Sequence, residues 1–257
     1  MSLIKSKEEI ETLREGGKRL SMVLAQVMQA ARAGVSTLSL DELAERLIRE
    51  DGDEPAFKGY RPDGARFPYP ATLCVSINDE IVHGVPRGDR VLKEGDIVSL
   101  DIGSIHKGLI TDMAVTVPVG EISFEDRKLI DATRGALHVA TRAVRAGGHI
   151  GDIGEAIEKY VDSRYFIVEG LGGHGVGHEV HEKPFIANFG KAGTGPGLVS
   201  GMVIAIEPML ALGSELIEQS RDGFTYVTRD GSHSAHFEAT LAVTENGADI
   251  LTPVINF

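Results

Sequence analysis

One eleven-residue stretch brings histidines, glutamates and glycines together: Gly172-Gly173-His174-Gly175-Val176-Gly177-His178-Glu179-Val180-His181-Glu182. It places three histidines and two glutamates among four glycines. Each glycine would destabilise a helix by about 1 kcal/mol relative to alanine, so the stretch is predicted to be extended. A glycine-rich extended backbone can pass close to a ligand or a metal ion.

Two other interpretations of this stretch have to be weighed. The helix of many metalloproteases carries His-Glu-x-x-His, and His178-Glu179-Val180-His181 is one residue too short for that motif. A surface loop with incidental histidines stays open as long as the stretch is considered alone.

The composition is ordinary for a globular protein, with 42% hydrophobic and 25% charged residues in a chain of 257. No apolar run reaches the length of a membrane span, and residues 1–10 lack the apolar core of a signal peptide. The single cysteine, Cys74, excludes an internal disulfide. The net charge of −12 disfavours non-specific binding to nucleic acid. We therefore predict a cytoplasmic protein without nucleic-acid or membrane partners.

Capping motifs and apolar periodicity predict an alternation of helices and strands. The capping box Ser6-x-x-Glu9 opens a helix that ends by Gly34, and Ser39-x-x-Glu42 opens a second helix through about Arg49. The other predicted elements are a long loop at 51–71, a strand at 72–77, a hairpin at 96–118, and helices at 126–146 and 152–163.

The sequence contains an internal repeat. The matching segments are residues 92–101 with 198–207 and residues 112–117 with 238–243. These alignments place Asp101 in register with Glu207 and Asp112 with Glu238. The helices also repeat, although helical patterns can align by chance. We predict a single domain over residues 1–257, built from two pseudo-symmetric α+β halves at about 1–120 and 121–257.

The turn of the predicted hairpin decides how Asp101 and Asp112 are arranged. If Ile105 faces Gly108 across the turn, the two aspartates face each other directly; a turn at Lys107-Gly108 also leaves them on one face. A three-residue turn would separate them. Their neighbours are apolar, and two buried like charges oppose folding. Since no lysine or arginine occurs at 96–101 or 108–112, a bound cation is predicted between them.

Glu207 and Glu238 extend this argument to four acids, because each lies in an apolar run. One such acid could equally pair with a buried arginine. Four in a repeated pattern, beside a histidine-rich stretch, favour a metal site. Carboxylates and an imidazole suit Mn²⁺, Fe²⁺, Co²⁺ or Zn²⁺, and five ligands suit two ions that share a bridging water.

Six motifs together make the chain resemble the type I methionine aminopeptidases, in the order of that family and over nearly the whole chain. They are Asn78-Asp79-Glu80-Ile81-Val82-His83-Gly84-Val85-Pro86, the hairpin with Asp101 and Asp112, Gly173-His174-Gly175-Val176-Gly177, His181-Glu182-Lys183-Pro184, Ile206-Glu207-Pro208 and Phe237-Glu238. The resemblance implies the pita-bread fold, an α+β fold with two pseudo-symmetric halves around a central antiparallel sheet. It also implies a catalytic domain that removes N-terminal methionine, preferably before a small residue, by attack of a metal-bridging hydroxide.

The resemblance further implies roles for individual residues and partners. The implied ligands of two divalent ions are Asp101, Asp112, His174, Glu207 and Glu238, with Asp101 bidentate and Asp112 and Glu238 bridging. The implied catalytic residues are His83 and His181, which would contact the substrate, and Glu207, which would transfer protons. The implied methionine pocket consists of Tyr60, Phe67, Tyr69, Cys74 and Phe224. Implied partners are peptides with N-terminal methionine and nascent chains, with the ribosome as a further candidate, and a monomer is expected.

Three features depart from the family pattern. Segment 63–70 looks longer than in many relatives, Phe224 stands where many bacterial relatives have tryptophan, and His178 has no ligand role to inherit. Type II enzymes are less similar, because Glu207 and Glu238 are only 31 residues apart and leave no room for the helical insertion of that type.

Two alternative functions are compatible with a pita-bread fold. An Xaa-Pro aminopeptidase or dipeptidase would share the fold and the ligands, but such enzymes usually carry an additional N-terminal domain, for which Asp101 lies too early. A non-catalytic pita-bread module that only binds peptides would lack metal ligands, whereas all five candidates occur here.

Overall fold

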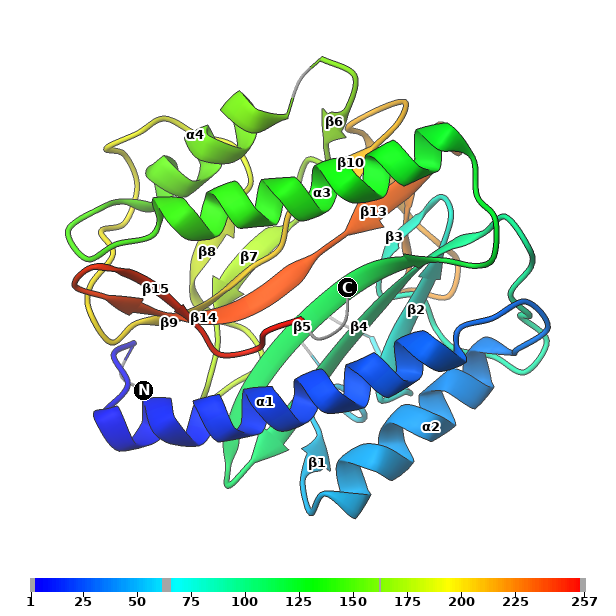
Figure 1. Ribbon diagram of the computed structural model, residues 1–257, viewed down its shortest axis with the longest axis horizontal. Coiled ribbons are helices and arrows are strands. Elements are labelled where there is room, and N and C mark those ends of the chain that lie inside the picture. Colours follow the sequence, from blue (N-terminus) through cyan, green and yellow to red (C-terminus); the bar gives the residue numbers. More distant parts are fainter. Residues whose placement is uncertain (1–2, 62–65, 162, 255–257) are drawn as a thin grey trace.

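Two pairs of helices lie on one side of a curved antiparallel sheet (Figure 1). The computed structural model describes residues 3–61, 66–161 and 163–254, so residues 63–65 of the segment predicted to be long lie outside the described part. The first pair is α1 (Lys7–Ala30) with α2 (Thr37–Glu50), and the second is α3 (Phe124–Ala143) with α4 (Ile150–Tyr160). In Figure 1, α2 and α4 lie on the outer sides of α1 and α3, which gives the molecule an approximate two-fold symmetry.

The main sheet has nine strands within the residues that the structure describes. They are β1 (Glu54–Pro55), β2 (Leu73–Ile77), β4 (Ile97–His106), β5 (Leu109–Pro118), β7 (Gly172–Gly175), β8 (Glu182–Ala187), β9 (Val203–Ile206), β14 (Glu238–Thr244) and β15 (Gly247–Ile250). The strand order is β1-β4-β5-β14-β9-β7-β8, with β2 paired to β4 and β15 paired to β14.

Two small sheets extend the main one. The first contains β6 (Phe166–Ile167), β10 (Met209–Ala211) and β13 (Ser234–His236). The second contains β3 (Glu80–Val82), β11 (Ile217–Gln219) and β12 (Tyr226–Thr228). Only Phe237 separates β13 from β14, so the first small sheet continues directly into the centre of the main sheet.

β5 and β14 join the two halves of the molecule. Glu238 pairs with Ala114 and Ala239 pairs with Met113. β4 lies beside β5 on one side of this junction, and β9 lies beside β14 on the other. The architecture confirms the predicted α+β fold with a central antiparallel sheet, and it brings the two aspartate-bearing strands next to the strands that carry the glutamates.

The hairpin of β4 and β5 turns through two residues. Lys107 and Gly108 both have positive φ angles, 49° and 82°, as the central residues of a type I′ turn require. Asp101 consequently lies opposite Ala114, and Asp112 lies opposite Gly103. Of the turns considered from the sequence, the one at Lys107-Gly108 is correct, so Asp101 and Asp112 share a face as diagonal neighbours and do not oppose each other directly.

Apolar side chains fill the space between the helices and the sheet. α1 buries Leu13, Leu20, Leu24 and Val27, and it packs against β4 and β5. Its Gly17 is needed for this contact, because a Cβ there would lie 2.2 Å from the carbonyl oxygen of Leu251. Glycine is a weak helix former, but at this position it allows α1 to pack closely against the chain at Leu251.

Helix ends differ from the sequence prediction by a few residues. Ser6 and Glu9 form the predicted capping box. α2 is capped by Ser36, whose hydroxyl accepts the backbone N–H of Ser39, so the predicted cap at Ser39 is wrong. α3 and α4 each begin two residues earlier than predicted, because the N-cap positions are Ser123 and His149, and each ends three residues earlier, where Val144 and Val161 adopt an extended backbone. Within the described part of the chain, no helix combines the length and apolarity needed to cross a membrane.

Candidate metal centre

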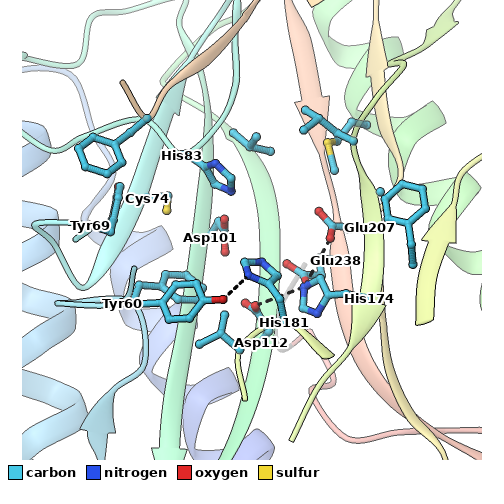
Figure 2. Close-up of a pocket in the computed structure, with 18 of the residues that line it drawn as sticks. Tyr60, Tyr69, Cys74, His83, Asp101, Asp112, His174, His181, Glu207 and Glu238 are labelled. Carbon is cyan, nitrogen blue, oxygen red and sulfur yellow. Dashed lines mark hydrogen bonds and ion pairs between the residues drawn. The ribbon is translucent and has the colours of Figure 1, made fainter. Parts of the chain in front are cut away.

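A cavity of about 220 Å³ lies at the junction of the two halves. The predicted site residues that line it are Tyr60, Tyr69, Cys74, His83, Asp101, Asp112, His174, His181, Glu207, Phe224 and Glu238. Figure 2 shows the four acids grouped with His174, while Tyr69 and Cys74 lie on the opposite side of Asp101. The fold therefore assembles residues from both halves of the chain around one space.

Two glycines allow the histidine-bearing strand β7 to fit between β8 and β9. A Cβ at Gly173 would lie 2.2 Å from the carbonyl oxygen of Ala205, and a Cβ at Gly175 would lie 2.3 Å from that of Lys183. Because both positions lack a side chain, β7 pairs closely with its neighbours and places His174 opposite Ala205. The prediction that this stretch is not helical is confirmed: the chain is extended at Gly172–Gly175 and bends at 177–181.

The four acids come from strands on both sides of the junction. Asp101 lies within β4, Asp112 within β5 and Glu238 at the start of β14, while Glu207 directly follows β9. The exposed fractions of the first three are 7%, 3% and 2%, and the Glu207 side chain is 12% exposed. Four carboxylates this deeply buried need a compensating positive charge.

The candidate ligand atoms lie close enough to one another to share a metal ion. Nε2 of His174 is 3.6 Å from Oε1 of Glu207 and 4.0 Å from Oδ2 of Asp112. Donor atoms of Asp112, His174 and Glu238 all lie within 4.8 Å of each other. A second group with the same spacing contains Glu207, His236 and Glu238, so Glu238 belongs to both. Asp101 lies outside these two groups but lines the same cavity.

The unpaired oxygens of this cluster fit a divalent cation. Across the described residues, Oδ1 of Asp101, Oδ1 of Asp112 and Oε1 of Glu238 are buried and accept no hydrogen bond. Buried polar atoms in native proteins nearly always have a partner. Carboxylates with one imidazole form a donor set for Mn²⁺, Fe²⁺, Co²⁺ or Zn²⁺, so these residues suit a metal centre.

The pKa values of the cluster follow from its burial. Burial raises the pKa of Asp101 to about 7 and the pKa of Glu207 to about 8. The pKa values of Asp112 and Glu238 are raised well above their ordinary range, first by burial and then by the neighbouring acids. Without a cation, ionisation of these four acids is therefore unfavourable, because each carboxylate is buried and is repelled by its neighbours.

Local hydrogen bonds orient two of the candidate ligands. Nδ1 of His174 donates to the carbonyl oxygen of Gly175 at 2.9 Å, which leaves the Nε2 lone pair facing the acids. Burial lowers the pKa of His174 to about 3, so its ring is neutral. The Thr240 hydroxyl accepts the Asp112 N–H at 2.9 Å and donates to the Asp112 carbonyl oxygen at 2.7 Å. The His174 ring and the backbone of Asp112 are thus each fixed by a hydrogen bond outside the cluster.

His83 and His181 border the cavity from two different loops. His83 has a φ of 60°, an uncommon left-handed conformation for a non-glycine residue. The Thr225 hydroxyl donates to its carbonyl oxygen at 3.3 Å. Nδ1 of His181 lies 2.9 Å from the Tyr60 hydroxyl, and its ring lies edge-on to His174 with centroids 4.5 Å apart. In Figure 2 both rings lie beside the acids.

An apolar wall adjoins the acids. The rings of Tyr69 and Phe224 meet edge to face with centroids 5.4 Å apart, and the buried Cys74 pairs with Asp101 across the sheet. Phe67, predicted to belong to this wall, lies outside the cavity. This residue is 56% exposed, and the Arg66 guanidinium lies 5.1 Å from the ring centroid. The loop thus directs this side chain to the surface, where the cation covers part of the ring.

His178 links the histidine stretch to the N-terminal helix. Its Nε2 lies 2.8 Å from Oε1 of Glu9, and its backbone N–H donates to Oε1 of Glu182 at 2.6 Å. The other carboxylate oxygen of Glu182 accepts from the ammonium of Lys5 at 2.7 Å. These contacts give His178 a structural partner, in keeping with the absence of a ligand role.

One histidine beside the acids was not selected from the sequence. His236 on β13 is 1% exposed, and its Nε2 lies 3.5 Å from Oε2 of Glu207 and 4.0 Å from Oε2 of Glu238. Burial lowers its pKa to about 4. A signal was present, since residues i and i+2 of an extended chain share a face, which places His236 on the face of Glu238.

The sequence matches a known peptidase family over most of its length. The pattern of metallopeptidase family M24 covers residues 11–245. The methionine aminopeptidase of Clostridium acetobutylicum is 43% identical over 253 residues, which is 98% of this chain and 99% of that protein.

Solved structures agree with this match. The crystal structure of a methionine aminopeptidase from Thermotoga maritima superimposes with a TM-score of 0.92 at 41% identity, covering 97% of this chain and 98% of that one. The prolidase of Pyrococcus horikoshii superimposes with a TM-score of 0.75 at 21% identity and covers 98% of this chain but 64% of its own. The second likeness shows the common fold, and the predicted pita-bread architecture is confirmed.

Proposed function

The chain belongs to metallopeptidase family M24, among its methionine aminopeptidases, and we propose on this premise that it removes the N-terminal methionine of peptides and nascent proteins using two divalent ions. The observation that carries the proposal is the cluster of buried acids with unpaired oxygens, directly beside an apolar wall. Nascent chains carry their initiator methionine in the cytoplasm, so the proposal places the enzyme there.

Asp101, Asp112, His174, Glu207 and Glu238 would hold the ions. Donor atoms of Asp112, His174 and Glu238 lie within 4.8 Å of one another, as do those of Glu207 and Glu238, which supports two neighbouring ion positions. Bound divalent ions polarise a peptide carbonyl and make water a nucleophile near neutral pH.

Glu207 is assigned the proton transfers. It accepts the proton of the attacking water and passes it to the leaving amine. In the metal-free protein, burial raises the pKa of Glu207 to about 8, and the positive charge of bound ions would favour the ionised carboxylate that can accept a proton. Its backbone is fixed, since the side-chain amide of Asn188 donates to the Glu207 carbonyl oxygen at 2.9 Å.

His83 and His181 are assigned contacts to the substrate. Both line the cavity but lie outside the two donor groups, so their rings are free to face a bound peptide. The Tyr60 hydroxyl lies at Nδ1 of His181 and would donate there, which leaves the ring proton on Nε2 for the peptide or the developing oxyanion.

The apolar wall predicts specificity for methionine followed by a small residue. Tyr69, Cys74 and Phe224 offer an apolar surface that suits an unbranched, flexible side chain. We expect Met-Ala-Ser to be cleaved, Met-Leu-Ser to be cleaved more slowly and Ala-Pro-Ala to be left intact. The assay uses metal-free enzyme reloaded separately with Mn²⁺, Fe²⁺, Co²⁺ and Zn²⁺. Cleavage of Ala-Pro-Ala with Met-Ala-Ser untouched would instead assign the enzyme to the Xaa-Pro peptidases.

Two of the three histidines in the glycine-rich stretch, His174 and His181, should differ in their effects when they are replaced. His174→Ala should weaken metal binding and activity together, since His174 would be a ligand. His181→Ala should lower kcat by about 100- to 1,000-fold, as expected for the loss of an oxyanion donor, while both ions stay bound. Metal content and steady-state kinetics of both variants provide the measurement. Loss of an ion from the His181 variant would contradict the assignment.

A further inference from the structure

His236 is a buried side chain without any hydrogen bond from its ring. It is 1% exposed, and within the described part of the chain neither Nδ1 nor Nε2 has a hydrogen-bond partner. A buried unpaired polar group destabilises a protein by roughly 1–3 kcal/mol. The ring faces two acids of the metal centre, so its partner should be found there.

The backbone of His236 is fixed on both sides. Its N–H donates to the Thr116 hydroxyl at 2.8 Å, and the same hydroxyl contacts the His236 carbonyl oxygen at 2.9 Å. The Ser99 hydroxyl lies 2.8 Å from that of Thr116. In the ladder of β10 and β13, His236 pairs with Met209, two residues after Glu207. The position of the ring relative to Glu207 is therefore set by the sheet.

Two histidines approach the two oxygens of Glu207 separately. Nε2 of His174 is 3.6 Å from Oε1, and Nε2 of His236 is 3.5 Å from Oε2. One oxygen of Glu207 thus faces the candidate ligand His174, while the other faces His236.

We propose that His236 positions Glu207 by donating its Nε2–H to Oε2, so that Glu207 would keep a fixed orientation toward the metal centre and during proton transfer. The proposal rests on the function proposed above for Glu207. His236 is a positioning residue, because it acts through Glu207 and not on the substrate.

The contrast with His174 favours a donor role over a ligand role. Nδ1 of His174 donates to the Gly175 carbonyl, which fixes the ring proton there and leaves Nε2 free to bind metal. Nδ1 of His236 has no such acceptor among the described residues. A neutral imidazole carries one N–H, and the carboxylates near Nε2 are the acceptors that would hold it there.

The test compares His236→Gln with His236→Leu in the full chain. Glutamine keeps an N–H donor of similar reach, whereas leucine fills similar space without a donor. Loss of a group that orients a metal ligand typically costs 10- to 100-fold in activity or metal affinity, so we expect His236→Leu to lower kcat by about that factor, with KM little changed. His236→Gln should keep most of the activity. The Co²⁺-loaded variants give a second readout, because the visible absorption of Co²⁺ reports the coordination geometry of the ion, which would change if Glu207 were misoriented, without any turnover.

Each outcome decides the proposal. Wild-type kinetics and an unchanged Co²⁺ spectrum in His236→Leu would show that the ring only fills space, and equal loss of an ion in both variants would show that His236 is a ligand. If His236→Leu does not fold, as judged by its thermal melt, His236→Asn replaces it, since the shorter amide stays polar but cannot reach Oε2. If the parent enzyme fails to cleave Met-Ala-Ser while the Co²⁺ spectra still separate the variants, the proposed reaction fails and the role of His236 stands.

Discussion

Replacing Glu207 by glutamine is expected to lower kcat by about 100- to 10,000-fold, the contribution that general acid–base catalysis typically makes. Glutamine keeps the shape of Glu207 and an oxygen that can bind metal, but it cannot accept a proton. KM for Met-Ala-Ser should change little, because the proposed role of Glu207 lies in the transition state and not in substrate binding.

The measurement is a full kinetic comparison at saturating metal, with the metal content of each preparation determined in parallel. Glu125→Gln provides the matched control, since Glu125 is an exposed acid in the first turn of α3, away from the cavity. A Glu207→Gln variant with both ions bound and near-parent kcat would show that another group transfers the proton.

Much of the fold could be predicted because local signals and the global pattern agree. The capping box at Ser6 and Glu9 marks the start of α1, and the glycines around His174 exclude a helix there. The repeat placed Asp101 with Glu207 and Asp112 with Glu238, and the structure brings all four acids to one cavity. Strong periodicity over long elements made these predictions reliable.

The remaining features depend on tertiary contacts that the sequence does not specify locally. The two turns of the β4–β5 hairpin considered from the sequence differ by a shift of two residues along one strand, which changes the two aspartates from directly opposed to diagonal. The short strands β6, β10 and β13 carry too few residues for a periodic signal, and they exist because they pair with one another.

For the same reason, the four acids of the site could be predicted from the sequence, whereas the places of His236 and Phe67 could not. Acids within apolar runs predict a bound cation, because burial of an unpaired charge is unfavourable. His236 lies in a run that also reads as an ordinary strand, and only the fold shows that its ring faces Glu207 and Glu238. Phe67 was predicted to lie in the pocket because it is aromatic and near Tyr69, but its loop points it outward.

Removing metal is expected to lower the melting temperature. An ion that binds only the folded state adds about 2.7 kcal/mol at a hundredfold excess over its dissociation constant. In a chain of this size, that corresponds to roughly 5 to 11 °C per ion. Chelation should therefore produce a clear downward shift, and Mn²⁺ or Co²⁺ should reverse it.

The decrease in melting temperature on removing metal should become larger as the pH rises. The pKa values of Asp101 and Glu207 in the folded, metal-free protein are raised to about 7 and about 8, whereas unfolded acids titrate near 4. Between about pH 4 and pH 8 the folded state binds more protons than the unfolded state, so its stability falls as the pH increases through this range. Bound metal replaces those protons, and the stabilisation by metal should be largest at the alkaline end.

Asp112→Asn tests whether the acids are the cause of this behaviour. The substitution would remove one of the mutually repelling charges, so the metal-free variant should melt above the metal-free parent, while its gain on adding metal should be smaller. Asp89→Asn is the control, because the Asp89 side chain is 74% exposed and should leave both quantities unchanged. Thermal melts of the three proteins, with chelator and with Mn²⁺, at pH 5, 6.5 and 8, provide the comparison. If the parent melts at one temperature in chelator and in saturating metal at every pH, protein groups already neutralise the four acids, and the physical argument for a metal centre fails.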